Sequence, residues 1–154
     1  MEVFIYYSDS VSYITPSEVK SLHAGATFET EDCDVPLCSR LSWHDLSIEL
    51  NLMPAEFIPE HLAQLTRDIL GIGLPNDARR TASLLSKLNA TRSVITVQVE
   101  PGLDPEGRAR LALARLAVGM RAIVLTSGAL FSTRFQLLLA PDGSYDPAAE
   151  IVTP

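Results

Sequence analysis

The sequence predicts an α+β (α/β-like) fold, a single mixed β-sheet of about six strands with helices packed on it. Its 154 residues match the usual size of one domain, which buries about 70% of its unfolded surface. Apolar residues make up 47% and charged residues 20%, as in globular proteins. Segments with strand character alternate with segments of helical period. We therefore expect residues 1–154 to form one α/β domain with a short C-terminal tail from about residue 141.

Strands are predicted where β-branched, aromatic or alternating residues run together, and helices where capping residues precede a 3.6-residue apolar period. The predicted strands are residues 3–7, 26–30, 43–52, 94–99, 122–126 and 135–140. The predicted helices are residues 15–25, 59–71, 77–88 and 104–120. The order is β-α-β-β, two helices, then β-α-β-β. It suggests pseudo-duplicated halves, although no sequence period repeats between them.

Local signals place the helix ends and the faces toward the core. Thr15 with Glu18 makes a capping box, and Asn76 is the expected cap of the third helix. We expect two helix faces to lie against the core: Ala78, Ala82, Leu85 and Leu88, and then Ala109, Leu113, Leu116, Ala117 and Met120.

The charge distribution argues against nucleic-acid binding. The formal net charge is −7, whereas a nucleic-acid-binding surface is basic. Residues 1–60 carry 11 acids against Lys20 and Arg40, whereas residues 61–154 carry 8 acids against 10 bases. The first residues lack a basic start followed by a long apolar stretch, and no later segment has the length of a spanning helix, so we expect neither export nor a membrane partner. The two cysteines, Cys33 and Cys38, indicate a reducing cytoplasm.

An acidic loop beside a tryptophan is the candidate partner-binding site. Glu31, Asp32 and Asp34 precede a predicted strand from Trp43 to Leu52, whose residues 46, 48, 50 and 52 face the core. Trp43 then falls on the opposite face with Ser47. There it is either covered or left as an exposed aromatic anchor with an acidic rim, as at an interface hot spot. This pattern favours a non-enzymatic protein-interaction module, immunity- or chaperone-like by analogy.

The alternative is a small-molecule-binding protein or enzyme with a cleft near the paired central helices. His61, Arg79 and Arg80 are its polar candidates, since arginines at a helix start can bind an anion. The other interpretation of these arginines is a solvated surface. An exposed sheet edge would also allow a homodimer.

No catalytic residue, cofactor or metal site is predicted. Cys33 and Cys38 are too loosely spaced for a zinc knuckle, and free thiols in a loop are the simpler interpretation. Gly71 and Gly73 follow a helix, whereas a nucleotide-binding glycine loop follows a strand. No serine lies in a nucleophile elbow.

Residues 42–49, Met53-Pro54 and residues 60–62 together form a tryptophan-led strand, a Met-Pro break and a helix containing His-Leu. In this pattern the chain resembles an uncharacterised bacterial protein family of unknown function. Residues 94–104 and 122–124 also resemble it, but Leu65 and Ile69 stand where the family is aromatic. The resemblance implies a bacterial source and an α/β fold, and it implies no activity.

Overall fold

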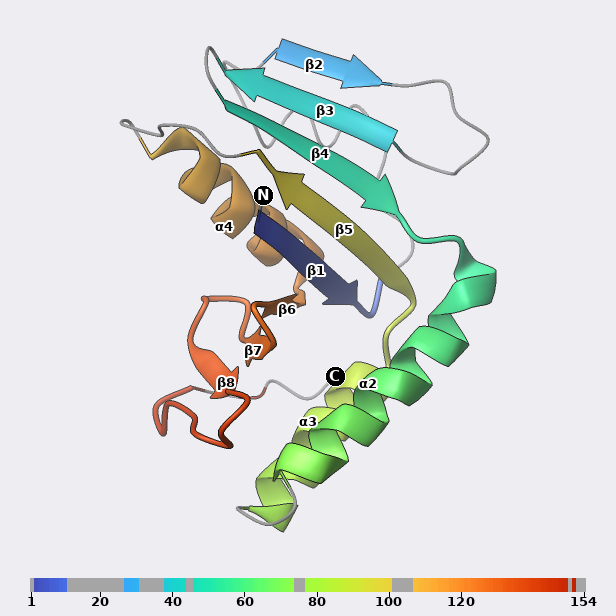
Figure 1. The fold of residues 1–154 in the computed structure, drawn as a ribbon, viewed down its shortest axis with the longest axis vertical. Helices are drawn as coiled ribbons and strands as arrows, with labels where there is room; N and C mark the ends of the chain where they lie inside the picture. Colours follow the sequence, from blue (N-terminus) through green and yellow to red (C-terminus); the bar gives the residue numbers. More distant parts are fainter. Residues whose placement is uncertain are drawn as a thin grey trace.

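A single antiparallel sheet organises the computed structural model, which describes residues 2–10, 27–30, 38–43, 46–73, 77–100, 107–149 and 151 (Figure 1). Eight strands of this part of the chain form the sheet in the order β2-β3-β4-β5-β1-β6-β7-β8. Their bounds are β1 Glu2–Ser8, β2 Thr27–Thr30, β3 Cys38–Trp43, β4 Leu46–Leu52, β5 Ser93–Val99, β6 Ile123–Thr126, β7 Ala129–Phe131 and β8 Leu137–Leu139.

The predicted α+β fold with one sheet is confirmed, but the expected mixed pairing is not found. All seven pairings among these strands are antiparallel. The reason is the position of β1. Helix α4 joins β5 to β6, and these two strands are parallel to each other, as a strand-helix-strand unit requires. Since β1 lies between them and is antiparallel to both, no parallel pair forms.

The likeness between the two halves does not extend to their topology. Each half contains one central strand and a three-stranded meander. However, β5 pairs with β4, the last strand of the first meander, whereas β1 pairs with β6, the first strand of the second. Among the described strands, the two halves therefore differ in their strand arrangement.

The helices cover both faces of the sheet, so the core has two layers. Helix α4 (Arg108–Met120) packs on one face, where Tyr6, Leu50 and Ile95 are buried. Helices α2 (Ile58–Gly73) and α3 (Ala78–Asn89) pack on the other, where Tyr7 and Val94 are buried. Neighbouring residues of β1 thus serve opposite layers, because strand side chains alternate between faces.

The helix predictions are confirmed in kind and differ in detail. A short 3-10 helix, η1 (Ala55–Phe57), precedes α2, which runs through Gly71 to Gly73. Asp77, rather than Asn76, caps α3, and its carboxylate accepts a hydrogen bond from the Arg80 backbone N–H at 3.0 Å. The predicted core face of α4 is buried throughout. In α3 the buried residues are Thr81, Leu84 and Leu88, so the predicted face is rotated. The predicted helix at residues 15–25 lies outside the described residues.

The predicted C-terminal tail packs back on the domain. The Asp146 N–H donates to the carbonyl of Leu137, the first residue of β8, at 2.9 Å. Ala149 is buried in the layer that also contains Leu138, and Ile151 packs against that layer. The C-terminal tail therefore lies beside β8 and borders the surface next to this strand.

Candidate functional site

The predicted partner-binding residues are only partly within the described structure. Glu31, Asp32 and Asp34 lie outside it. Trp43 is the last residue of β3, and Leu46 is the first residue of β4, which pairs antiparallel with β3, so the predicted continuous strand is wrong. In register Trp43 lies directly opposite Leu46. Opposed residues of an antiparallel pair share a face. The register position of Trp43 therefore belongs to the face of Ile48 and Leu50 rather than that of Ser47, while its exposure stays a prediction.

The imidazole of His61 interacts with a buried tyrosine of the sheet. In the first turns of α2, His61 Nε2 lies 2.7 Å from the Tyr7 hydroxyl, and the two rings stack with centroids 5.6 Å apart. Burial lowers the pKa of His61 and raises the pKa of Tyr7 far above its usual range. Both groups are therefore neutral near pH 7, and their contact joins α2 to β1.

The two arginines at the start of α3 have different environments. Arg79 is exposed. The Arg80 guanidinium lies 4.0 Å above the ring of Tyr145, and its Nη2 donates to the Leu138 carbonyl at 3.4 Å. Its buried Nε has no hydrogen-bond partner among the described residues. Arg80 thus holds the C-terminal tail against α3 through a cation–π contact.

The structure does not bring His61, Arg79 and Arg80 to one place. Helices α2 and α3 are packed neighbours joined by a short connection, so they run antiparallel. Their first turns lie at opposite ends of the pair, separated by most of the length of α2. A helix of that size is about 24 Å long at about 1.5 Å per residue. The three predicted residues therefore do not form one ligand site.

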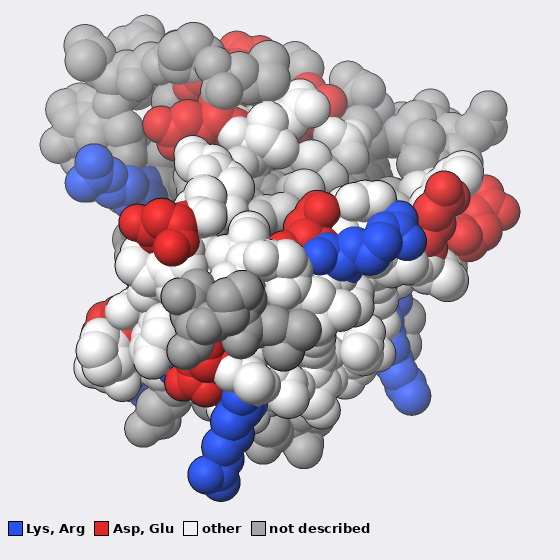
Figure 2. Space-filling view, turned by 60° about the horizontal axis from the view of Figure 1, so that its bottom comes forward, with Lys and Arg blue, Asp and Glu red and all other residues white. Residues whose placement is uncertain are grey.

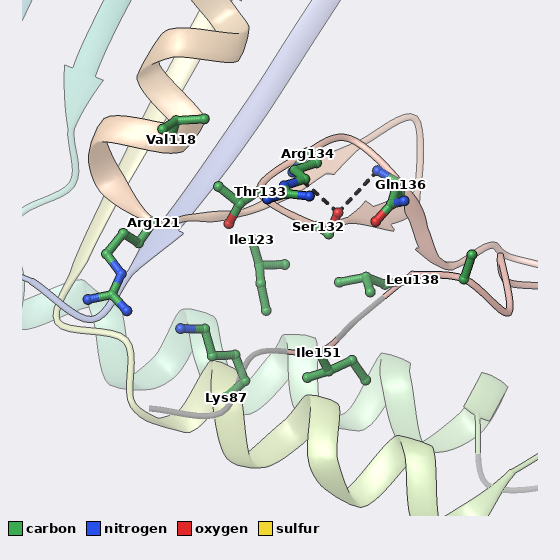
Figure 3. Close-up of a pocket in the computed structure, with 11 residues that line it drawn as sticks. Lys87, Val118, Arg121, Ile123, Ser132, Thr133, Arg134, Gln136, Leu138 and Ile151 are labelled. Atoms are coloured by element: carbon green, nitrogen blue, oxygen red, sulfur yellow. Dashed lines mark hydrogen bonds between the residues drawn. The ribbon is translucent and has the colours of Figure 1, made fainter.

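A pocket of about 490 Å³ lies elsewhere beside the paired helices. Figure 3 shows it between α3, the C-terminal end of α4, the loop from β7 to β8 and the tail. Its lining residues are Lys87, Val118, Arg121, Ile123, Ser132, Thr133, Arg134, Gln136, Leu138, Ala148 and Ile151. All of them come from the second part of the chain, in which bases outnumber acids.

Three cations line this pocket, and we call Lys87, Arg121 and Arg134 the basic rim. No Asp or Glu of the described chain lines it. In Figure 3 Lys87 and Arg121 extend toward the same side of the pocket, and Arg134 lies across it near Ser132. On the face shown in Figure 2, charges of both signs are interspersed among uncharged residues. The basic rim is therefore a local concentration of positive charge on an acidic chain.

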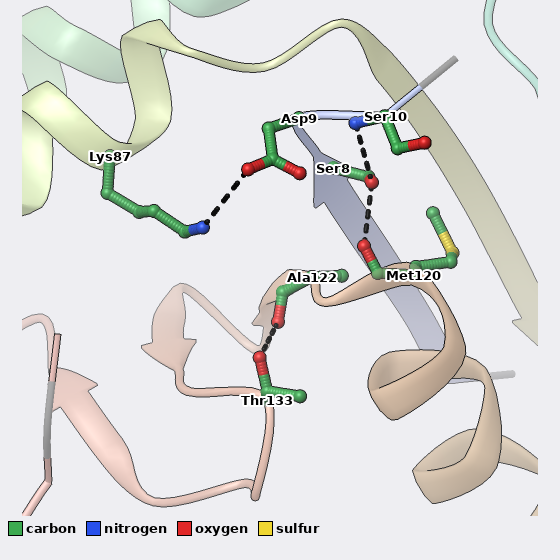
Figure 4. A network of polar contacts seen from close by, with 7 residues as sticks. All are labelled: Ser8, Asp9, Ser10, Lys87, Met120, Ala122 and Thr133. Atoms are coloured by element: carbon green, nitrogen blue, oxygen red, sulfur yellow. Dashed lines mark hydrogen bonds and ion pairs between the residues drawn. The ribbon is translucent and has the colours of Figure 1, made fainter. Parts of the chain in front are cut away.

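Lys87 is oriented by an ion pair at the pocket edge. Its ammonium lies 3.7 Å from a carboxylate oxygen of Asp9, and the side chains are 10% and 25% exposed respectively. Asp9 follows β1, whose Ser8 hydroxyl donates to the Met120 carbonyl at 2.7 Å (Figure 4). The end of β1 and the end of α4 are thus tied together next to Lys87. This connection fixes the position of Asp9 relative to the pocket.

The backbone positions of both arginines are fixed by hydrogen bonds. Arg121 follows α4 in the left-handed conformation, with φ 51°, and its N–H bonds to the Ala117 and Val118 carbonyls. Arg134 lies in a loop folded around the buried hydroxyl of Ser132, which accepts from the N–H groups of Arg134 at 3.3 Å and Gln136 at 3.1 Å. The backbone of both arginines is therefore held in place, and both side chains are exposed.

Between and beside these charges the pocket has an apolar lining formed by Ile123, Leu138 and Ile151, which we call the apolar floor. Ile123 and Leu138 are buried core residues of β6 and β8, and Ile151 comes from the tail. The exposed Val118 extends the apolar lining at the edge. An apolar floor with a few converging polar groups is the usual composition of a ligand pocket.

Sequence reasoning predicted a cleft near the paired helices but missed the residues of this pocket. Lys87, Arg121 and Arg134 are far apart in sequence and belong to no motif. They come together because β6 lies beside β1 rather than beside β5. The available signal was the positive balance of residues 61–154, which indicates the sign of the charge and not its location.

Comparisons with known proteins do not identify a relative. No family model matches the chain, and neither the curated proteins nor the solved structures include a match. The resemblance carried by the tryptophan-led strand and the Met-Pro break therefore gains no support. In the described part of the chain, no helix has the length and apolar character needed to cross a membrane.

Proposed function

We propose that this chain is a small-molecule-binding protein whose ligand occupies the pocket between α3, the end of α4 and the tail. One observation carries the proposal: three cations and an apolar floor line the same hollow of about 490 Å³. Pockets that bind small molecules are typically about 300–1,000 Å³ and combine these two kinds of surface. The proposal assigns binding and no catalytic step.

A metabolite-library thermal-shift screen tests this proposal. A ligand present at about 100 times its Kd stabilises the folded state by about 2.7 kcal/mol. For a domain of this size that corresponds to a rise in Tm of roughly 5–10 °C. Methyl NMR shifts of Ile123 and Leu138 then locate the bound compound.

A pocket-filling variant is the matched control for the screen. Ala148 is exposed and lines the pocket, whereas Ala82 is exposed on α3 and is not among its lining residues. We expect Ala148→Trp to abolish binding and Ala82→Trp to leave it unchanged. A ligand that binds equally to both variants occupies another site and contradicts the proposal.

The protein-interaction hypothesis remains a separate proposal that rests on sequence alone. Its support is the excess of acids in residues 1–60, including Glu31, Asp32 and Asp34, and the adjacent Trp43. A quencher titration of Trp43 fluorescence tests it. Strong quenching in the native protein supports an exposed Trp43 that anchors an interface. Fluorescence that the quencher does not reach shows that Trp43 is buried and contradicts this role.

Three finer proposals concern the location, the source and the oligomeric state of the protein. The two cysteines support a cytoplasmic location, and the family resemblance supports a bacterial source. The sheet edges at β2 and β8 support a homodimer. Analytical ultracentrifugation tests the last, and a monomer at every concentration examined would contradict it.

A further inference from the structure

We propose that the ligand of this pocket is an amphiphilic anion. Its carboxylate or phosphate headgroup binds to the basic rim, and its apolar body lies on the apolar floor. The inference rests on the proposed binding function and adds the chemical class of the ligand. It follows from the sign of the charges, the pairing of Lys87 and the division of the pocket into a charged and an apolar part.

The charge balance at the pocket favours an anion. The basic rim supplies three cations, of which Lys87 is paired with Asp9. Within the described residues Arg121 and Arg134 have no ion pair with a carboxylate. Among the residues that the structure describes, the site therefore has two cations in excess, although the whole chain carries a net charge of −7. Local cations of this kind concentrate an anion that the overall charge would repel.

The two kinds of cation suit one headgroup. A guanidinium presents planar, forked donors that match a carboxylate or phosphate in two parallel hydrogen bonds, and an ammonium adds a compact charge. Lys87 and Arg121 extend toward the same side of the pocket in Figure 3. A headgroup bound there would share the Lys87 ammonium with Asp9. Because Asp9 is partly exposed, water can solvate that carboxylate as the ligand binds.

The size and floor of the pocket indicate that the ligand has an apolar body. A free inorganic anion would fill a small part of about 490 Å³ and would leave the exposed Val118 and the partly buried Ile151 in contact with water. An apolar chain or ring of the ligand placed there removes its own surface and that of the pocket from water, which is favourable in proportion to the area buried. The ligand class is therefore amphiphilic rather than a simple ion.

A structural role alone is the competing explanation for Arg121. A cation after the end of a helix interacts favourably with the negative end of the helix dipole. On that explanation Arg121→Gln lowers the stability of the protein and leaves anion binding unchanged. The experiment therefore measures stability and binding on the same variants.

The test uses three probes of similar shape, hexanoate, hexyl phosphate and the uncharged hexanamide, and inorganic phosphate as a probe without an apolar body. Each is titrated into the full chain while methyl NMR follows Ile123, Leu138 and Ile151. We expect both amphiphilic anions to shift these methyl groups and hexanamide to bind at least about tenfold more weakly, the factor given by loss of one charge-assisted hydrogen bond. Binding of the anions should weaken as salt is raised, because the rim is partly exposed.

The variant pair isolates the charge. Arg121→Gln/Arg134→Gln removes two cations from the rim, and we expect about a tenfold loss of affinity for hexanoate. Arg67→Gln/Arg79→Gln removes the same net charge from exposed residues outside the pocket lining, and we expect no change. If Arg121→Gln lowers stability but leaves affinity intact, the competing structural role is correct.

The remaining outcomes separate the inference from the proposed function. Equal affinity for hexanoate and hexanamide, or unchanged affinity in the rim double variant, overturns the anionic class. Equal affinity for hexyl phosphate and inorganic phosphate overturns the apolar body. If the library screen yields only uncharged ligands at the floor, the binding function stands and this inference falls. If no compound of any class binds at the floor, both fall.

Discussion

Removing the hydroxyl of Tyr6 tests whether α4 is tied to the sheet as the structure indicates. Tyr6 is 0% exposed, and its hydroxyl donates to the Leu113 carbonyl of α4 at 3.0 Å. Burial raises the pKa of Tyr6 far above its usual range, so the hydroxyl stays protonated and can donate. Tyr6→Phe deletes this hydrogen bond and leaves the aromatic ring in the core.

The expected cost follows from what the carbonyl retains. Because Leu113 lies inside α4, its carbonyl keeps the bond to the fourth following residue. The change therefore removes one buried hydrogen bond without leaving a fully unsatisfied acceptor. We expect the free energy of unfolding to fall by about 1 kcal/mol. In a domain of this size this lowers Tm by roughly 2–4 °C.

Urea unfolding monitored by circular dichroism measures this loss. The control is Tyr145→Phe, because the Tyr145 hydroxyl lies 3.5 Å from the Asp77 carboxylate, too far for a strong bond. We expect the control to change stability by less than about 0.5 kcal/mol. If the two substitutions cost the same, the Tyr6 hydroxyl does not tie α4 to the sheet and the reasoning is refuted.

Three further predictions concern the fold. Burial lowers the pKa of His61, so the unfolded state binds its proton more readily than the folded state as pH falls through about 6.5. The folded state should therefore lose stability below that pH. His61→Gln should reduce this loss, which urea titrations at pH 7.5 and 5.5 measure. An equal loss of unfolding free energy in the variant and the unchanged protein would contradict the prediction. Gly128 has φ +75° with Pro141 beside its absent Cβ, whereas helical Gly71 has open space. In chemical denaturation, we expect Gly128→Ala to lower the free energy of unfolding by roughly 1 kcal/mol and Gly71→Ala to raise it by about 0.5 kcal/mol. If both substitutions change stability in the same direction, the turn geometry is contradicted. Leu84→Ala should lower the free energy of unfolding by about 3 kcal/mol, and substitution of the partly buried Leu85 by Ala should lower it clearly less. The reverse order would support the helix face expected from sequence.

The predictable parts of the fold were those with a strong local pattern. The strand over residues 94–99 and the buried face of α4 were predicted because their apolar residues repeat with one unambiguous period. The hairpin between β6 and β7 was missed, although Ser127-Gly128 is a typical turn dipeptide, and both residues have positive φ as a tight hairpin requires. Strand β3 was missed because its polar residues resemble a loop.

The face of Trp43 illustrates what sequence alone could not decide. Alternation predicts the face correctly only while the chain stays in one strand. Trp43 belongs to β3 and Leu46 to β4, so the register partner of Trp43, and not its sequence parity, sets its face. The basic rim was unpredictable for a related reason, since Lys87, Arg121 and Arg134 lie on three separate segments that only the tertiary arrangement brings to one pocket.

The most direct test of the account is the position of the first ligand found by the library screen. Methyl NMR of the full chain with that ligand should show shifts at Ile123, Leu138 and Ile151, and these shifts should be absent in Ala148→Trp. Shifts that map away from the apolar floor, or that persist in Ala148→Trp, would contradict the assignment of this pocket as the binding site.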